Sequence, residues 1–453
     1  MFEVILAINK NWGIGYKNDL PWNCPEDLKI FREKTMGNIV IVGRNTCDTL
    51  PKLKGREVIC LSGKPEINPD WKNEVKVVNS IYNLYKVVGK DYYNKKVFIC
   101  GGAKVYNSLL SQKSLVDRVH LSILNNDNKC DAFINKKLFR DFIIESKEFQ
   151  DDSFAHYVLK KAATDEYQYL DLLRELLIKT NEREGRNGIT SSLFVRHMEF
   201  NLQNGYPLLT TKKMWKKGIV EEFLFFVKGS TDSTTLSEKK VRIWEGNTSD
   251  EFIKSRNLPY KKGVMGPMYG YQWRFFGAKY VVDKNGIPQK TTGGVDQLQK
   301  VIDMIKTDPH SRRIILTSYN PSQAEEGVLY PCHSIAIQFY VQDEFLDMFC
   351  YNRSQDFFLG VPYNIASSSL LLMTVSKLTG KKPRFLKMTM GDTHLYEEHY
   401  SAALEQVDRV PYSFPRLVFP EITSLKDMEK LSSKDFVLTG YNSHPKITAK
   451  MAV

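Results

Sequence analysis

The hydrophobic pattern of this 453-residue chain changes near residue 160. Before that point, short apolar runs alternate with turn residues and amphipathic stretches. After it, an amphipathic helix is predicted, with Leu170, Leu173 and Leu177 on one face. Because the chain is too long for one ordinary core, we expect two domains, at 1–160 and 170–453, joined by a short junction at 161–169.

The first part is typical of an α/β domain with a strand-rich centre. Amphipathic spacing predicts helices at 26–34 and 104–110. The second part mixes strands with longer predicted helices at 218–228, 295–306 and 364–379. The predicted strands of the first part are V-I-L-A-I, I-V-I-V-G, V-I-C-L-S, V-K-V-V, V-F-I-C-G-G, V-H-L-S-I-L, F-I-I-E-S and H-Y-V-L-K.

The formal net charge of +12 raises the question of a nucleic-acid partner. The basic residues are spread in short pairs, such as Lys212-Lys213 and Lys381-Lys382, so we expect anionic small substrates rather than nucleic acid as the main partner. The seven cysteines form no C-x-x-C pair, and no signal or membrane span is visible. We therefore expect a cytoplasmic protein with no membrane partner and no metal.

Cys332, in the string L-Y-P-C-H, is the candidate nucleophile of the second domain. A cysteine becomes nucleophilic where positive charge or donors stabilise its thiolate, although a lone cysteine is more often a small buried hydrophobe. Arg353 and Ser354 offer a guanidinium and a hydroxyl that suit a phosphate monoester, and further arginines could complete the cluster. Each arginine, taken singly, fits a surface ion pair equally well. These further arginines are Arg186, Arg312 and Arg313.

Asn364 is a sharper clue to the substrate. A carboxamide has a donor and an acceptor that match the O4 and N3–H edge of uracil, whereas an aspartate would suit cytosine. The alternative is a helix N-cap. His394 and Tyr396, two apart on a predicted extended segment, project to one side and could hold a sugar hydroxyl, or they could be polar residues of the core.

From about residue 170 to 453 the chain resembles thymidylate synthase. The resemblance rests on E-E-F-L-F-F, R-I-W, G-P-M-Y-G-Y-Q-W-R, D-P-H-S-R-R-I-I-L and the C-terminal P-K-I-T-A-K-M-A-V, beside the motifs above. It implies an α+β domain in which Cys332 attacks C6 of dUMP and makes C5 nucleophilic toward the methylene group of 5,10-methylenetetrahydrofolate. Glu222 would organise proton transfers.

The resemblance also implies the binding residues of this domain. Arg312 and Arg313 would reach the phosphate of the neighbouring subunit, which implies a homodimer through this domain, and Val453 would close over the folate. The dUMP contacts would be Arg186, Arg312, Arg313, Arg353, Ser354, Asp356, Asn364, His394 and Tyr396. The folate contacts would be Ile243, Trp244, Asp356, Leu359 and Gly360.

Three features depart from the pattern of that family. Asn352 stands where Gln is usual, and Tyr363 stands where Phe is usual. The phosphate loop reads R-E-G-R-N-G-I-T, which leaves open whether Arg183 or Arg186 meets the phosphate.

Asp27 is the informative residue of the first domain. A helix through P-E-D-L-K-I-F would turn Asp27, Leu28 and Phe31 toward one surface. An acid there is usually solvated or complements the helix dipole. A buried carboxylate could instead pair with the amino and ring N–H donors of a pterin.

Two glycine-bearing turns suggest a phosphate-rich cofactor. Gly43-Arg44-Asn45-Thr46 and Gly101-Gly102-Ala103-Lys104 each follow a predicted strand and open a helix, where backbone N–H groups favour phosphates. Either turn alone is more often structural. Arg44, Ser62 and Lys64 could recognise an extra 2′-phosphate, which favours NADPH over NADH.

Residues 1 to about 160 resemble dihydrofolate reductase through W-G-I-G, L-P-W, D-L-x-x-F, G-R-N-T, L-K-G-R and G-G-x-x-V-Y, in that order. The resemblance implies a mixed sheet flanked by helices. Asp27 would assist protonation at N5 of dihydrofolate while NADPH delivers hydride to C6, and Arg56 would hold the glutamate carboxylate. Ser122 replaces the usual Thr, and Cys100 replaces a usual Ile.

That resemblance carries two sets of binding residues. The folate set is Ile5, Asp27, Leu28, Phe31, Leu50, Leu53, Arg56 and Ser122. The cofactor set is Ala7, Ile14, Gly43, Arg44, Asn45, Thr46, Leu61, Ser62, Lys64, Gly101, Gly102, Ala103, Lys104, Val105 and Tyr106.

Both resemblances in one chain, with the reductase first, match the bifunctional enzymes of protozoa and plants. A synthase turnover leaves dihydrofolate, which the reductase restores to tetrahydrofolate. A deoxycytidylate hydroxymethylase on the same scaffold is one alternative, and Asn364 in place of Asp is against it. A basic RNA-binding regulator would have lost catalytic residues, yet Cys332, Glu222 and Asp27 are all present.

Overall fold

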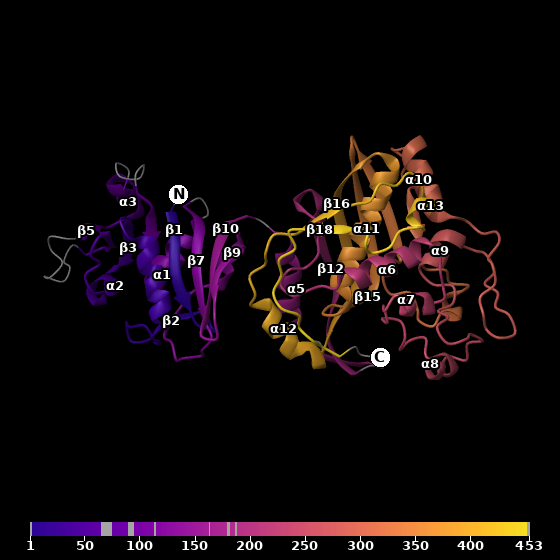
Figure 1. The fold of residues 1–453 in the computed structure, drawn as a ribbon, viewed down its shortest axis with the longest axis horizontal. Coiled ribbons are helices and arrows are strands. Elements are labelled where there is room, and N and C mark those ends of the chain that lie inside the picture. The colour runs from indigo at the N-terminus through magenta and orange to yellow at the C-terminus, as the bar shows by residue number, and fades with distance from the viewer. Residues whose placement is uncertain are drawn as a thin grey trace. The chain divides into compact units, whose positions relative to one another are not determined.

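The computed structural model describes residues 2–64, 75–88, 95–112, 115–162, 164–178, 182–185 and 188–450. The chain separates into two compact units, Met1–Thr164 and Asp165–Val453 (Figure 1). The last strand of the first unit ends at Lys161, and the first helix of the second begins at Glu166. The predicted junction, 161–169, spans this division.

An eight-stranded mixed sheet forms the centre of the N-terminal unit, in the order β5-β4-β3-β6-β1-β7-β10-β9. The neighbours from β5 to β7 are parallel, and β10 is antiparallel to both β7 and β9. All eight predicted runs are strands of this sheet. Its strands are β1 (Phe2–Ile8), β3 (Ile39–Gly43), β4 (Glu57–Leu61), β5 (Val75–Val78), β6 (Val97–Ile99), β7 (Val116–Leu124), β9 (Phe142–Gln150) and β10 (Phe154–Lys161).

Helix α1 of the N-terminal unit starts where the sequence provides a start signal. Helix α1 has Pro25 at its first position, acids in its first turn and bases in its last, which suits the helix dipole. The predicted helices at 26–34 and 104–110 are confirmed by α1 and α4. The helices are α1 (Pro25–Thr35), α2 (Arg44–Thr49), α3 (Ile81–Val88), α4 (Ala103–Leu110) and the 3-10 turn η2 (Lys136–Phe139), and a small ribbon pairs β2 (Gly13–Gly15) with β8 (Ala132–Phe133).

A six-stranded sheet, in the order β11-β12-β16-β15-β14-β13, is the framework of the C-terminal unit. Only the β15–β16 pair among these described strands is parallel. The strands are β11 (Glu182–Gly185), β12 (Gly188–Asn201), β13 (Ile315–Thr317), β14 (Ala336–Gln342), β15 (Phe345–Asp356) and β16 (Lys382–Tyr396), with a separate ribbon of β17 (Arg416–Val418) and β18 (Val437–Thr439).

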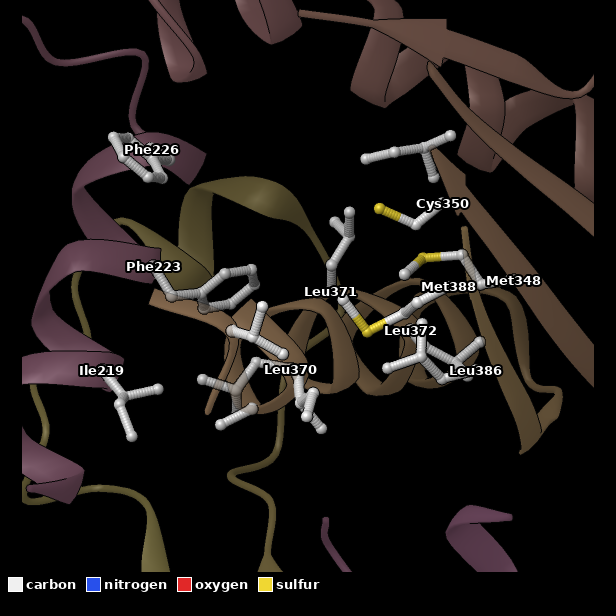
Figure 2. Close-up of a cluster of buried hydrophobic side chains, with 14 of the residues drawn as sticks. Ile219, Phe223, Phe226, Met348, Cys350, Leu370, Leu371, Leu372, Leu386 and Met388 are labelled. Atoms are coloured by element: carbon white, nitrogen blue, oxygen red, sulfur yellow. The ribbon is translucent and has the colours of Figure 1, made fainter. Parts of the chain in front are cut away.

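Helix α11 (Gly360–Thr379) lies in the core between this sheet and helix α6 (Lys216–Val227). Figure 2 shows Leu371 and Leu372 of α11 near Met348 and Met388 of the sheet, with Phe223 of α6 on the other side. Burial alternates along β15, so one face of the sheet packs on the helices and the other is outside the core. Thirteen of the twenty residues of α11 are buried, so the helix is covered on most of its surface.

The long predicted helices are present with shifted ends. The helices predicted at 218–228 and 295–306 are α6 and α10, and the helix predicted at 364–379 begins earlier, at Gly360. The earlier start arises because Asp356 Oδ1 accepts the N–H groups of Phe358 and Leu359, each at 3.0 Å. The remaining helices are α5 (Glu166–Ile178), α7 (Thr234–Glu238), α8 (Asp250–Ser255), α9 (Gly270–Phe275), α10 (Gln297–Thr307), α12 (Tyr400–Val407) and α13 (Leu425–Met428), with 3-10 turns η3 (Leu202–Asn204), η4 (Ala324–Glu326) and η5 (Glu397–His399).

Glu166 anchors the start of the C-terminal unit. It is fully buried, and its carboxylate accepts the backbone N–H and the hydroxyl of both Thr210 and Thr211 at 2.7–2.9 Å. Four donors satisfy a buried acid that would otherwise be costly. This arrangement ties α5 to the core of its unit. Within the described ranges, no helix is both long and apolar enough to span a membrane.

Candidate active sites

Cys332 lies between Pro331 and β14. Its backbone contacts Arg353 of strand β15. Its Sγ is 3.3 Å from the Tyr269 hydroxyl, which also accepts the Cys332 N–H at 3.3 Å. Arg353 N–H donates to the Cys332 carbonyl at 2.8 Å. Burial raises the pKa of the Cys332 thiol, and the Tyr269 hydrogen bond and the Arg353 charge act in the opposite direction. The site therefore contains the two groups that stabilise a thiolate.

His333 follows the cysteine but does not supply positive charge. Its ring stacks on Tyr269 with centroids 4.4 Å apart, and burial lowers the pKa of His333 to about 4. The imidazole is therefore neutral near pH 7. Arg353 is the cation that acts on Cys332.

Glu222 on α6 is a half-buried acid, and Trp244 is its donor among the described residues. Burial raises the pKa of Glu222 to about 7, and the indole Nε1 of Trp244, which donates to Oε1 at 2.8 Å, acts in the opposite direction. A carboxyl group that titrates near neutral pH can both accept and return protons. This behaviour fits the predicted role of Glu222.

The predicted phosphate arginines lie in three places. Arg353 is exposed on β15, and Arg312 and Arg313 are exposed in the turn before β13, where neither guanidinium pairs with an acid of the described ranges. On β11, Arg183 Nη1 is 3.6 Å from Asp392 Oδ2, next to the His394 segment. Arg186 lies outside the described residues.

Asn364 lies in the first turns of α11, not at its N-cap, which is Leu359. Its Nδ2 donates to Gln355 Oε1 at 2.8 Å, and the buried Gln355 donates Nε2 to the Ser354 carbonyl at 2.9 Å. Ser354 and Asp356 are half-buried at the end of β15. The end of β15 thus meets the start of α11 at these polar groups.

His394 and Tyr396 lie two apart on β16, and their rings meet edge to face with centroids 5.3 Å apart. His394 Nδ1 is 3.2 Å from Asp392 Oδ1. In the sheet, Asp356 of β15 is the partner of His394 of β16. The predicted pyrimidine and sugar contacts are therefore on neighbouring elements.

The predicted folate contacts of this unit surround Glu222 and the start of α11. Trp244 is buried, and Ile243 and Leu359 pack half-buried against the same core cluster. Gly360 is the first residue of α11. Val453 lies outside the described residues.

Sequence reasoning missed three residues of this site: Tyr269, Gln355 and Lys212. Lys212 belongs to one of the short basic pairs of the sequence. It is buried, donates to the Phe358 carbonyl at 2.6 Å and lies 3.7 Å from the Phe358 ring centroid. Burial lowers the pKa of Lys212 to about 7, while the charge of Asp356 acts the other way. The apolar residues on both sides of the pair were the available signal, because Leu208, Leu209 and Met214 are buried too.

Asp27 of the N-terminal unit is half-buried on α1 and hydrogen-bonds to Ser122 of β7. Burial raises the pKa of Asp27, and the Ser122 hydrogen bond acts in the opposite direction. Ser122 Oγ is also 2.9 Å from His156 Nδ1. In the sheet, Ala7 of β1 is the partner of Ser122 of β7. An acid with a raised pKa next to a hydroxyl is suited to holding a proton.

The other predicted folate residues of this unit flank α1 and α2. Phe31 is half-buried and lies 5.9 Å from the Arg56 guanidinium, whereas Leu28 is 49% exposed. Arg56 Nη1 is 3.4 Å from the Thr35 hydroxyl, while its Nε, within the described part of the chain, has no partner. Leu50, Leu53 and Cys100 pack half-buried against one core cluster, and Ile5 is buried on β1.

The two glycine turns fit a phosphate-bearing cofactor. Helices α2 and α4 begin at Gly43 and Gly102 with no capping side chain, after the adjacent parallel strands β3 and β6. Gly43 N–H donates to the Gly101 carbonyl at 2.7 Å, and a Cβ on Gly102 would lie 2.9 Å from Thr46 Oγ1. Two helix N-termini therefore lie side by side, neither capped by a side chain of the described residues, and N–H groups at such ends bind phosphates in proteins.

The remaining predicted cofactor residues have mixed surroundings. Arg44 Nε already pairs with Asp48 at 2.7 Å, and Ser62 Oγ accepts the Lys64 N–H at 3.1 Å. Tyr106 donates to the Ile5 carbonyl at 2.6 Å. Val105 is buried, Ala103, Ile14 and Leu61 are half-buried, and Asn45 and Lys104 are exposed.

Comparison with known proteins divides the chain at the same place. Residues 1–163 match the dihydrofolate reductase family, and residues 167–453 match the thymidylate synthase family. The chain is thus a fused pair of folate-dependent enzymes, a reductase followed by a synthase.

Full-length relatives have the same arrangement. The chain is 36% identical to the bifunctional dihydrofolate reductase-thymidylate synthase of Paramecium tetraurelia, over all of this chain and 99% of that protein. It is 35% and 34% identical to the proteins of the same name from Zea mays and Leishmania major, over all of this chain and 97% and 95% of theirs. The chain belongs to the bifunctional dihydrofolate reductase-thymidylate synthase family and has both activities. Both predicted activities and both predicted domain folds are confirmed.

Proposed function

We propose that the synthase site methylates dUMP through covalent attack by Cys332. The Cys332 sulfur adds to C6 of the uracil ring, and the electron pair moves to C5, which becomes the nucleophile. The cosubstrate 5,10-methylenetetrahydrofolate, when bound, supplies the one-carbon unit and the hydride of the new methyl group. The proximity of Arg353 and Tyr269 to Cys332 carries this assignment, because both stabilise the attacking thiolate.

The other synthase residues bind the substrate and move protons. Glu222 accepts and returns protons near the ring, since its pKa is near 7. Asn364 recognises the uracil edge, and His394 and Tyr396 hold the sugar. Arg353, with Ser354, binds the phosphate, together with Arg183 or Arg186. The contact of Arg183 with Asp392, beside His394, favours Arg183. Ile243, Trp244, Asp356, Leu359 and Gly360 form the folate side, over which Val453 closes.

In the reductase site, Asp27 holds the proton that N5 of dihydrofolate requires, and Ser122 orients its carboxyl group. NADPH, when bound, supplies the hydride for C6. The N–H groups that follow Gly43 and Gly102 hold its phosphates, and Arg44, Ser62 and Lys64 recognise the 2′-phosphate once Arg44 leaves Asp48. Arg56 holds the glutamate carboxylate of the folate, which supplies a partner for its free Nε.

One coupled assay separates the two sites. The full chain is given dUMP, 5,10-methylenetetrahydrofolate and NADPH, and thymidylate formation and NADPH oxidation are followed separately. We expect Cys332→Ala to abolish thymidylate formation but to oxidise NADPH when dihydrofolate is added. We expect Asp27→Asn to form thymidylate and to lose NADPH oxidation. Loss of both activities in either variant, in folded protein, would contradict the assignment.

We also propose a homodimer through the synthase sheet. The outer face of this sheet has large apolar side chains in the open: Phe194 is 77% exposed, Tyr340 65% and Ile315 52%. Patches of this kind mark protein interfaces. In a two-fold dimer, Arg312 and Arg313 would then reach the phosphate of the neighbouring subunit, which fits their lack of an acidic partner in the described ranges.

Mixing inactive subunits tests the shared site. Cys332→Ala subunits and Arg312→Ala/Arg313→Ala subunits are each expected to lack synthase activity. After mixing and subunit exchange, one site of each mixed dimer is intact, so roughly a quarter of the wild-type synthase activity should return. The matched control mixes Cys332→Ala with Arg353→Ala, whose lesions belong to the same subunit's site, and it should restore none. Restoration in the control, or none in the test, would contradict the shared site.

We also propose that the protein works in the cytoplasm. All seven cysteines are free, which fits a reducing compartment, and four of them are buried: Cys24, Cys47, Cys60 and Cys350.

A further inference from the structure

Gln355 is buried at the end of β15, and both ends of its side-chain amide are paired. Its Nε2 donates to the Ser354 carbonyl at 2.9 Å, and its Oε1 accepts Asn364 Nδ2 at 2.8 Å. Only 1% of Gln355 is exposed. This residue could not be selected from the sequence, because a glutamine between Ser354 and Asp356 has no distinctive spacing.

This hydrogen-bond chain has only one possible direction. A backbone carbonyl can only accept, so Gln355 must turn its NH₂ group toward Ser354. Its carbonyl oxygen must then face Asn364, and Asn364 must present its own NH₂ group. The reverse orientation of Asn364 would place two acceptor oxygens against each other inside the protein, which is costly. The Ser354 carbonyl thus fixes the orientation of Asn364 through Gln355.

The fixed orientation leaves a defined recognition edge on Asn364. One N–H of Nδ2 is used by Gln355, and the second N–H and Oδ1 remain, since Oδ1 meets no donor among the described residues. That pair complements a ring with a carbonyl at position 4 and an N–H at position 3. A ring with an amino group at position 4 and a bare N3 needs the reversed carboxamide.

We propose that Gln355 is a specificity-determining positioning residue, which holds Asn364 in the orientation that selects a 4-oxo pyrimidine nucleotide over a 4-amino one. The inference rests on the proposed role of Asn364 in reading the base. Gln355 itself acts through Asn364 and does not touch the base. It selects by making the wrong orientation costly, as well as by supporting the right one.

The test is the ratio of the Kd for dCMP to the Kd for dUMP, measured by calorimetry on the full-length protein without folate. Gln355→Met removes the amide and nearly keeps the size, so both orientations of Asn364 become accessible. We expect the ratio to fall about tenfold, mainly through tighter dCMP binding, because one buried polar mismatch has been removed. Gln168→Met is the matched control, since Gln168 also pairs both ends of its amide, with Glu199 on β12, outside the site. It should leave the ratio unchanged.

Two further variants separate the possible failures. Gln355→Glu, protonated in its buried position, can still donate to Ser354 and accept from Asn364, so it should retain the wild-type ratio even if Gln355→Met folds poorly. Asn364→Ala should lose the preference. If Asn364→Ala loses it and Gln355→Met keeps it, the inference about Gln355 is wrong and the role of Asn364 survives. If Asn364→Ala keeps the preference, the proposed role of Asn364 fails first. Loss of the preference in Gln355→Glu would also overturn the inference.

Discussion

The Trp244–Glu222 hydrogen bond allows a quantitative prediction about the synthase. The indole N–H, 2.8 Å from Oε1, stabilises the ionised carboxylate, while burial raises the pKa of Glu222 to about 7. Trp244→Phe keeps a large aromatic ring and removes the donor. A hydrogen bond to a charged group contributes about 1.5–3 kcal/mol. Since one pKa unit corresponds to about 1.4 kcal/mol, the pKa of Glu222 should rise by about one to two units in the variant.

The sign follows from the charge state that the donor favours. Losing a donor to the carboxylate disfavours the ionised form, so the pKa moves up, not down. The assay is the pH dependence of kcat/KM for dUMP from about pH 6 to about pH 10, followed by tritium release from C5 of labelled dUMP. The limb that belongs to Glu222 should move to higher pH by at least about one unit.

Trp273→Phe is the matched control for this prediction. The indole N–H of Trp273 is also buried and donates at 2.8 Å, but to the Ser318 hydroxyl, which does not titrate in this range. Its profile should keep the wild-type limb. An unmoved limb in Trp244→Phe, or a downward shift, would refute the role of Trp244 in setting the protonation of Glu222.

Two predictions concern stability. Glu166→Ala leaves four donors unpaired in the core and should lower the free energy of unfolding of the synthase domain, measured by urea, by about 3–5 kcal/mol. Glu175→Ala, which removes a partly exposed pair with Arg196, should cost under about 1 kcal/mol, and equal losses in the two variants would contradict the prediction. Burial lowers the pKa of His156 to about 4, below its ordinary value of 6.5, so the reductase domain should lose up to roughly 3 kcal/mol of stability as pH falls from about 6.5 to about 4. His156→Gln can still pair with Ser122 without titrating, so its urea midpoint for reductase activity should depend less on pH, and an unchanged dependence would count against this account.

Elements with local signals could be predicted from the sequence. The strand 39–43 is a continuous apolar run, and α1 has a proline and acids at its start, so both depend on near neighbours. Helix α11 was predicted to begin at Asn364, four residues after its actual start at Gly360. Asp356, which accepts the N–H groups of Phe358 and Leu359 just before that start, was a local start signal that the prediction did not use.

The site residues also differ in how far they could be predicted from the sequence. Cys332, Glu222 and Asp27 stand in spaced motifs, and the sequence could point to them. Their partners could not be found in that way. Tyr269 meets Cys332 across 63 positions, and Trp244 meets Glu222 across 22. Lys212 was one basic residue of a pair in the sequence, and its burial could not be predicted from that pair. Pairing across such separations depends on the packing of whole elements, which residue spacing does not encode.

Covalent attack by Cys332 on the nucleotide ring can be tested directly by intact-mass spectrometry. The full-length protein is incubated with 5-fluoro-dUMP and 5,10-methylenetetrahydrofolate, because fluorine at C5 cannot leave as a proton does and the covalent complex persists. We expect a mass increase that maps to the peptide containing Cys332 and disappears in Cys332→Ala. Folded protein that binds dUMP but forms no adduct, or an adduct on another of the seven cysteines, would contradict it.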